Sequence, residues 1–507
     1  MRIRIVVCYR PRYLRGHLID FVPPLTGIHL AALTPPDHEV EVIHEQVRAV
    51  PVDHGADLVA LSFFSGFARG AYALADRYRA LGVTVVAGGP HASYWPEEAL
   101  QHVDAVVAGE AEEAWPRLLR DFESGSLKPV YRGSPASMLG LPAPRYDLLE
   151  RRFVVPRVLQ ATRGCPFSCS FCSVPGFNPG FRVRPVAEVI RDIQQSRFPL
   201  WWQNKVVWFW DDNLLVRRVW AKQLLRELTG LDRWWLTQAS IDIVNDKELL
   251  DLMQRSGCIG IFLGIESLDD RDLRSAGKPQ NHPSKYREAI NRLHDRGICV
   301  MAGFISGFDD QRPDTIVTTA ERLNALGVDV PFLSILTPFR GTPLYEQLLS
   351  ADRILKDRDW PHYNGYNVAF RPAQMSPDQL LGAHRDLWRR AFGPGAVAQR
   401  IERGRRQLNH GALWLSLTMN AFYGLKRLTG NLPAVAPATS AGLIDHPLTP
   451  HLNNSTTKPL HPDFSPDTLR QNTRSPQQAG PPDEKPHPGA HSENRPGVIS
   501  DQNRMAE

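Results

Sequence analysis

Three cysteines gather within eight residues in the first half of the chain, at Cys165, Cys169 and Cys172. They are spaced C-x3-C-x2-C and are interleaved with polar positions. Three thiolates on one short loop can bind three irons of a four-iron cluster and leave the fourth iron open to another ligand. The spacing therefore predicts a 4Fe-4S cluster on this loop.

Two other interpretations of these cysteines fit less well. Structural zinc is held by four ligands, and no fourth cysteine or histidine lies close by in the sequence. Cysteines that serve only as core packing do not explain three in eight residues between polar neighbours. Cys8, Cys258 and Cys299 do stand on or beside apolar stretches, which is typical of core positions. Six cysteines in 507 residues are too few for a disulfide framework, so we expect a reducing cytoplasm.

The elements that must position the cysteines alternate between strands and helices from residue 157 onward. We expect strands near residues 157–161, 205–210, 234–239, 259–265, 298–305 and 330–336. Apolar side chains recur between them at helical spacing, as at Val186, Val189 and Ile193. Six strand–helix units predict a partial (β/α)6 barrel with its site at the carboxyl ends of the strands. The cysteines directly follow the first of these strands.

Polar residues and glycines follow the later strands of this predicted barrel. Asp211, Asp212 and Asn213 end the second strand. The fourth and fifth strands end in Glu266, Ser267, Gly303, Ser306 and Gly307. Each motif is weak alone, because glycines at strand ends are common. In order, at consecutive strand ends behind the cysteines, they form a strong combined pattern.

The first 125 residues alternate between strands and helices in the same way. Strands are expected near residues 2–8, 39–44, 57–63, 83–87 and 104–108. This order predicts a doubly wound parallel sheet of the flavodoxin type, in which ligands lie outside the carboxyl ends of the strands. The turns at those ends contain Ser62, Gly88, Gly89, His91, Gly109 and Glu110. Tight strand-to-helix turns explain any one of these segments equally well, but three together favour a bulky or phosphorylated ligand.

The remaining segments differ in composition. Residues 126–156 are punctuated by prolines, which predicts a linker between a domain of residues 1–125 and a barrel of residues 157–345. We expect a helical region at residues 346–431. Residues 432–507 hold 13 of the 42 prolines and a single aromatic residue, which predicts a disordered tail.

Two apolar features remain to be placed. Trp208 and Trp210 alternate along the second barrel strand, so we expect both on one face, against the covering helices. Residues 413–427 form a strongly apolar helix candidate. Docking on the barrel is expected for it, and resting on a membrane surface is the alternative that suits a lipid-like substrate.

Charge and hydropathy exclude several classes of function. The formal net charge of +5 comes from mixed signs, which argues against nucleic-acid binding driven by phosphate contacts. No window approaches the roughly 20 apolar residues that span a bilayer. The first apolar run is too short for a signal peptide. We expect a cytoplasmic protein without a nucleic-acid partner, with any membrane contact confined to the surface.

The run from residue 162 to residue 172 resembles the signature of the radical S-adenosylmethionine superfamily. The resemblance implies that the reduced cluster cleaves S-adenosylmethionine to methionine and a 5′-deoxyadenosyl radical, with electrons from an external donor such as flavodoxin or ferredoxin. It places the methionine amino group at Asp211, Asp212 and Asn213, the ribose at Glu266 and Ser267, and the adenine beside Gly303, Ser306 and Gly307. The usual Gly-Gly-Glu of the family is absent, and Asp-Asp-Asn stands in its place.

Residues 1–125 resemble the cobalamin-binding domain that precedes the barrel in one large class of this superfamily. The matching pieces include the runs at residues 85–91 and 106–112. The resemblance implies that cobalamin lies against the turns of Ser62, Gly88, Gly89, His91, Gly109 and Glu110. His91 beside a Gly-Gly-Pro turn also fits a structural hydrogen-bonding role. The D-x-H-x-x-G motif is absent from residues 9–13, which implies that the lower face of the cobalt lacks this histidine.

Together these resemblances imply a cobalamin-dependent radical enzyme that methylates an unactivated carbon of a small or lipid-like substrate. A ring-forming enzyme similar to the anaerobic tetrapyrrole cyclases is the first alternative, because it shares the two-domain layout. A tRNA methylthiotransferase ranks lower, because that class carries further cluster cysteines in its N-terminal domain, where this chain has only Cys8. A non-catalytic scaffold ranks equally low, because the cysteine triad is complete.

Overall fold

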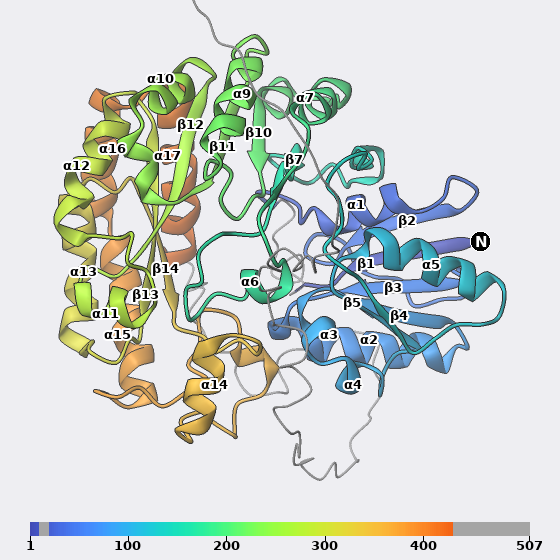
Figure 1. Cartoon of the computed structure of the whole chain (residues 1–507). Coiled ribbons are helices and arrows are strands. Elements are labelled where there is room, and N and C mark those ends of the chain that lie inside the picture. Colours follow the sequence, from blue (N-terminus) through green and yellow to red (C-terminus); the bar gives the residue numbers. More distant parts are fainter. Residues whose placement is uncertain (10–19, 429–507) are drawn as a thin grey trace, which may run out of the picture. The chain divides into compact units, whose positions relative to one another are not determined.

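Two six-stranded parallel sheets organise the chain in the computed structural model, which describes residues 1–9 and 20–428 (Figure 1). The predicted sequence of a doubly wound domain, a partial barrel and a helical C-terminal region is confirmed. The predicted disordered tail at residues 432–507 lies outside the described residues, as does most of the loop at residues 9–13.

The first sheet has the order β2-β1-β3-β4-β5-β6. Its strands are β1 (Arg2–Val7), β2 (Glu39–His44), β3 (Leu58–Ser62), β4 (Thr84–Gly88), β5 (Ala105–Ala108) and β6 (Val130–Arg132). Five of them lie where the apolar runs predicted them. The sixth is a correction, because β6 pairs with β5 from within the segment predicted to be a linker. The first domain therefore extends past residue 125.

Helices cover both faces of this sheet, as expected of a doubly wound domain. They are α1 (Thr26–Leu33), α2 (Ala68–Ala80), α3 (Pro90–Tyr94), α4 (Pro96–Ala99) and α5 (Ala111–Glu123). Helices α1 and α5 pack with Ile3 and Ile5 on one face. Helix α2 packs with Val6 and Val59 on the other. Because apolar side chains along each strand point alternately to opposite faces, they contribute to two cores, one on each side of the sheet.

The second sheet is the predicted partial barrel, with the order β14-β13-β12-β11-β10-β7 and parallel pairing throughout. Its strands are β7 (Val158–Leu159), β10 (Val206–Phe209), β11 (Trp234–Ala239), β12 (Cys258–Glu266), β13 (Cys299–Ser306) and β14 (Val330–Ile335). A short antiparallel pair, β8 (Thr162–Arg163) and β9 (Arg182–Val183), follows the first strand. This pair carries the cysteine loop between its strands.

The barrel helices are α7 (Val186–Gln195), α9 (Arg218–Thr229), α10 (Lys247–Arg255), α12 (Tyr286–His294) and α13 (Pro313–Leu326). Shorter helices stand between them at α6 (Val174–Phe177), α8 (Trp201–Lys205) and α11 (Asp270–Ser275). The C-terminal region adds α14 (Pro343–Ser350), α15 (Pro377–Ala391), α16 (Pro394–Gln407) and α17 (His410–Leu428). The predicted helical C-terminal region is confirmed in these four helices, whereas residues 351–376 contain a single 3-10 turn, Trp360–His362, and no α-helix.

Helix α17 covers the inner face of the barrel strands. Its Leu415 belongs to the same buried cluster as Val206 and Trp208 of β10, whereas Val207 and Phe209 face the outer helices. Docking of this helix on the barrel is therefore confirmed. The expected direction of Trp208 is wrong, because it points inward to the cluster that α17 completes and not to the outer helices.

Within residues 1–9 and 20–428, no helix combines the length and apolar character that a bilayer crossing requires.

Candidate active site

The cysteine loop leaves the β8 strand through a tight turn. Gly164 has φ +82°, and a Cβ at this position would overlap the carbonyl oxygen of Gly180. Only glycine therefore fits where the two ends of the loop approach each other. The amide of Cys172 donates to the carbonyl of Cys169 at 3.0 Å, which brings these two cysteines onto one turn.

The three cysteines are buried or half-buried. Burial, together with the neighbouring cysteines and Asp212, raises the pKa of the Cys172 thiol to about 11. Burial also raises the pKa of Cys169. Metal ligation requires thiolates, so binding of a cluster would displace protons from this loop. Cys8, Cys258 and Cys299 are buried in the core, as expected.

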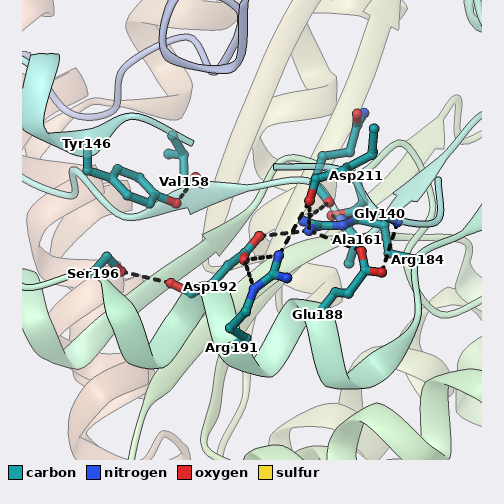
Figure 2. A network of polar contacts seen from close by, with 12 residues as sticks. Gly140, Tyr146, Val158, Ala161, Arg184, Glu188, Arg191, Asp192, Ser196 and Asp211 are labelled. Carbon is teal, nitrogen blue, oxygen red and sulfur yellow. Dashed lines mark hydrogen bonds and ion pairs between the residues drawn. The ribbon is translucent and has the colours of Figure 1, made fainter. Parts of the chain in front are cut away.

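Asp211 fixes the start of the cysteine loop rather than pointing into an open site. Its carboxylate accepts from the Ala161 amide at 3.0 Å, from the Thr162 hydroxyl at 2.7 Å and from the Thr162 amide (Figure 2). Burial raises the pKa of Asp211 to about 7 against these hydrogen bonds. The side chain expected at the methionine group of a cofactor thus positions the strand that leads to the cysteines.

A second carboxylate supports the same strand from helix α7. Asp192 is fully buried and accepts from Arg184 at 2.8 Å and from Arg191 at 2.8 Å (Figure 2). The amide of Arg184 donates to the carbonyl of Ala161 at 2.9 Å. The segment before the cysteine loop is therefore held from both sides, by Asp211 and by Arg184.

Asp212 is the open member of the Asp-Asp-Asn motif. Its Oδ2 atom is buried and has no hydrogen-bond partner in the described part of the chain. Burial raises the pKa of this carboxyl, and its charge also acts on Cys172. Asn213 is engaged, because it donates to Ser240 at 3.3 Å and accepts from the Ser240 amide at 3.2 Å. An orphaned carboxylate oxygen beside the cysteine loop fits an ammonium group.

Glu266 ends β12 with φ +59°, where the strand register shifts. Lys278, which sequence analysis did not single out, donates to its Oε1 at 2.6 Å. The positive charge of Lys278 also lowers the pKa of Cys169, although burial raises it more. Ser267 faces elsewhere, since its hydroxyl donates to Asp272 at 2.6 Å. Glu266 and Lys278 therefore form a charged pair close to the cysteines.

Ser306 and Gly307 end β13, as expected. The Ser306 hydroxyl lies 3.1 Å from Nδ1 of His384, and the indole of Trp388 donates to Nε2 of the same ring at 3.2 Å. Because Nε2 accepts this hydrogen bond, the single N–H of the neutral ring is on Nδ1. His384 therefore donates to the Ser306 hydroxyl. Burial lowers the pKa of His384 to about 3, which keeps the ring neutral. His384 was also missed, because it comes from α15, far along the chain.

The glycine turns of the first sheet lie at its carboxyl edge, where Ser62 and Gly88 pair at the ends of β3 and β4. Phe64 stands just beyond Ser62 and is 61% exposed, so the edge carries an apolar side chain as well as backbone. His91 is fully buried and lies within 3.1 Å of the hydroxyls of Ser65 and Tyr72. The structural interpretation of His91 therefore fits better than a pocket residue.

Glu110 contacts the barrel instead of an open turn. Its carboxylate accepts from Arg163 at 2.7 Å, from Arg182 at 2.9 Å and from the Ala136 amide at 2.9 Å. Burial opposes its ionisation, but the hydrogen bonds of Arg182 and Arg163 outweigh burial and lower its pKa. This side chain, expected at a ligand, serves the contact between the two domains.

Comparisons with known proteins agree with this arrangement. The radical SAM superfamily matches residues 159–323, and the B12 binding domain matches residues 29–119. The bacteriochlorophyllide d C-12(1)-methyltransferase of Chlorobaculum tepidum is 30% identical over 388 residues, which cover 75% of this chain and 84% of the relative. The chain belongs to the cobalamin-dependent radical S-adenosylmethionine methyltransferases. This family works with a 4Fe-4S cluster, S-adenosylmethionine and cobalamin, so the three expected cofactors are confirmed.

Other relatives of this radical S-adenosylmethionine methyltransferase act on different substrates. The hopanoid C-2 methylase of Rhodopseudomonas palustris is 26% identical over 428 residues, 79% of each chain. An anaerobic magnesium-protoporphyrin IX monomethyl ester cyclase of Cereibacter sphaeroides is 25% identical over 345 residues, 61% of this chain and 55% of the relative. The structure of the methyltransferase TsrM from Kitasatospora setae shares the fold, with a TM-score of 0.61 at 16% identity over 85% of this chain and 99% of that one.

Proposed function

We propose that this enzyme methylates an unactivated carbon of a large apolar substrate of the tetrapyrrole type. The observation that carries the proposal is the meeting of three thiols and the unpaired Oδ2 atom of Asp212 at one edge of the barrel. The 30% identity to a bacteriochlorophyllide methyltransferase supports the substrate class.

Each side chain at the edge has a distinct duty in this proposal. Cys165, Cys169 and Cys172 would hold the 4Fe-4S cluster, which would supply the electron that cleaves S-adenosylmethionine. Asp212 would accept from the amino group of S-adenosylmethionine through its unpaired Oδ2 atom, which would relieve the cost of leaving that atom buried and unpaired. Glu266, oriented by Lys278, accepts from the ribose hydroxyls.

The adenine side of the site is held by the C-terminal region. Ser306 lies at the end of β13 and accepts from His384, so its own hydroxyl proton is free to donate. Gly303 and Gly307 contribute backbone in this proposal, because a Cβ at these positions would meet Phe262 at 2.9 Å and Leu380 at 3.0 Å. Ser267 and Asp211 act through other residues in this proposal, because their side chains are already paired within the protein.

Cobalamin lies against the carboxyl edge of the first sheet in this proposal. The backbone of Ser62, Gly88, Gly89 and Gly109 lines that edge without bulky side chains. The exposed Phe64 ring offers apolar contact to the corrin, which would otherwise leave this side chain in water.

Methyl transfer is tested with S-adenosylmethionine that carries a deuterated methyl group. The reduced holoenzyme, given a chlorophyllide substrate, should form 5′-deoxyadenosine and S-adenosylhomocysteine together and place the label in the product. A ring-forming enzyme would yield 5′-deoxyadenosine with an unlabelled product, and that result would reject methyl transfer while leaving the radical chemistry intact.

We also propose a compartment, an electron donor and a membrane contact for this enzyme. It works in the cytoplasm with an external donor such as flavodoxin or ferredoxin. Helix α17 leaves Leu417 and Leu428 exposed beyond the face that it packs on the barrel, which supports a peripheral membrane contact for an apolar substrate. Sedimentation with anionic vesicles tests this contact, and recovery of the enzyme in the supernatant alone would contradict it.

A further inference from the structure

Two consecutive aromatic residues of the first domain face two consecutive residues of the last barrel loop. Tyr94 ends α3, and its ring fills the space where a Cβ at Gly341 would stand. Gly341 has φ +81°, so this turn also needs glycine for its backbone. Trp95 lies beneath the guanidinium of Arg340, with 3.6 Å between Cζ and the ring centroid. We call these four residues the seam.

Arg340 is the unsatisfied member of the seam. It is half-buried, yet none of its nitrogens is sealed from solvent, and no hydrogen bond or ion pair joins its side chain to residues 1–9 or 20–428. Arg353 of the same region differs, because its two Nη atoms donate to the carboxylate oxygens of Asp309 at 2.9 and 2.6 Å. An indole ring holds the face of a guanidinium and leaves the N–H edge free.

The seam reaches the cysteine loop through Tyr94. The Tyr94 hydroxyl donates to the carbonyl of Ser173 at 3.2 Å, and Ser173 directly follows Cys172. Burial, with a smaller effect of Cys172, raises the pKa of Tyr94 to about 12. The Arg340 loop itself follows the carboxyl end of β14, the side of the barrel on which substrates bind. A ligand group held by Arg340 would therefore belong to a substrate that extends toward the cysteines.

We propose that Arg340, oriented by Trp95, binds a carboxylate of the substrate. The inference rests on the proposed function and narrows it, because it selects an apolar substrate that carries a free acid. A guanidinium edge presents paired donors that match the two oxygens of a carboxylate. A hydrocarbon such as a hopanoid offers no acceptor to this edge, whereas a chlorin with a propionate side chain does.

The test compares an acid with its ester on the complete enzyme. The holoenzyme, with its iron and cobalamin contents verified, is titrated with pyropheophorbide a and with its methyl ester, and binding is followed by quenching of tryptophan fluorescence. The native enzyme should bind the acid about tenfold or more tightly than the ester, the size expected for one charged hydrogen-bonded pair. Arg340→Gln should bind both equally, at the affinity of the ester, and Arg340→Lys should keep part of the preference.

A matched variant separates this effect from a general loss of positive charge. Arg312→Gln removes an exposed arginine at the start of α13 and should keep the full preference for the acid. Equal affinities in the native enzyme, no binding of either compound, or an unchanged preference in Arg340→Gln would each overturn the proposal. If the acid is preferred but no deuterated methyl group reaches a product, the anchor stands and the proposed methyl transfer fails.

Discussion

Arg163 and Glu110 form a buried ion pair between the cysteine loop and the first domain, with 2.7 Å between Nη1 and Oε2. Their side chains are 8% and 3% exposed, so water screens the pair poorly. Arg163 also contacts Glu112 at 2.7 Å, and Arg182 shares the Glu110 carboxylate from the facing strand β9. Because Arg163 stands two residues before Cys165, this pair ties the position of the first domain to that of the cluster loop.

Removing the Glu110 charge should loosen this contact. In Glu110→Gln, the buried guanidinium of Arg163 and the half-buried one of Arg182 lose their shared carboxylate, so the apparent free energy of unfolding should fall by about 3 kcal/mol or more. Thermal unfolding measures this effect. Glu113→Gln, an exposed neighbour on the same helix, should change stability by less than about 0.5 kcal/mol. Equal effects of the two variants would contradict a buried role for the pair.

The same carboxylates predict how stability depends on pH. His29 and Arg163 lower the pKa of Glu112 in spite of its burial, and the pKa of Glu110 is lowered as well. A carboxyl group with a lowered pKa in the folded state stabilises that state above its unfolded value of about 4.3, and the contribution is lost as the pH falls further. The difference in Tm between native enzyme and Glu112→Gln should be full at neutral pH and shrink below about pH 4.3. A difference that does not change with pH would disprove this linkage.

Apolar periodicity made most of the fold predictable, and its failures have physical causes. Long apolar strands such as β12 and β13 can be recognised from the sequence alone. The β6 strand is three residues long with Tyr131 as its buried side chain, so it shows no period and depends on pairing with β5. The alternation along β10 placed Trp208 and Trp210 on one face of the strand. It did not identify the correct face, because α17, which covers the inner side, lies far downstream in the sequence.

The residues of the candidate site also divide into those that the sequence predicts and those that it does not. The cysteine loop could be proposed from the sequence, because the thiolates of a cluster are close in sequence when one loop supplies them. Lys278 and His384 were not, since their significance lies in the distant side chains that they contact, Glu266 and Ser306. Glu110 was placed at the correct edge of the first sheet, but its partner Arg163 comes from the other domain, and no local pattern reports such a pairing.

Asp212 should govern affinity for S-adenosylmethionine without affecting the cluster. Asp212→Asn keeps the shape of the side chain but removes the charge that we propose binds the ammonium group of S-adenosylmethionine, so the Kd should rise by about tenfold or more. Iron content should stay unchanged, because the thiols remain. Equilibrium dialysis with labelled S-adenosylmethionine and an iron assay measure both quantities. Loss of iron with unchanged affinity would move the role of Asp212 from the cofactor to the cluster loop.

The three cysteines should account for the whole cluster. The anaerobically reconstituted enzyme should bind about four irons per chain, and replacement of Cys165, Cys169 and Cys172 by Ala should abolish this, because no other thiol lies on that loop. Cys258→Ala and Cys299→Ala are matched controls, since both thiols are fully buried in the barrel core and should cost stability but not iron. Iron and sulfide assays decide between these expectations. A triple variant that retains about four irons would show that the ligands lie elsewhere, and the assignment of this loop as the cluster site would then be wrong.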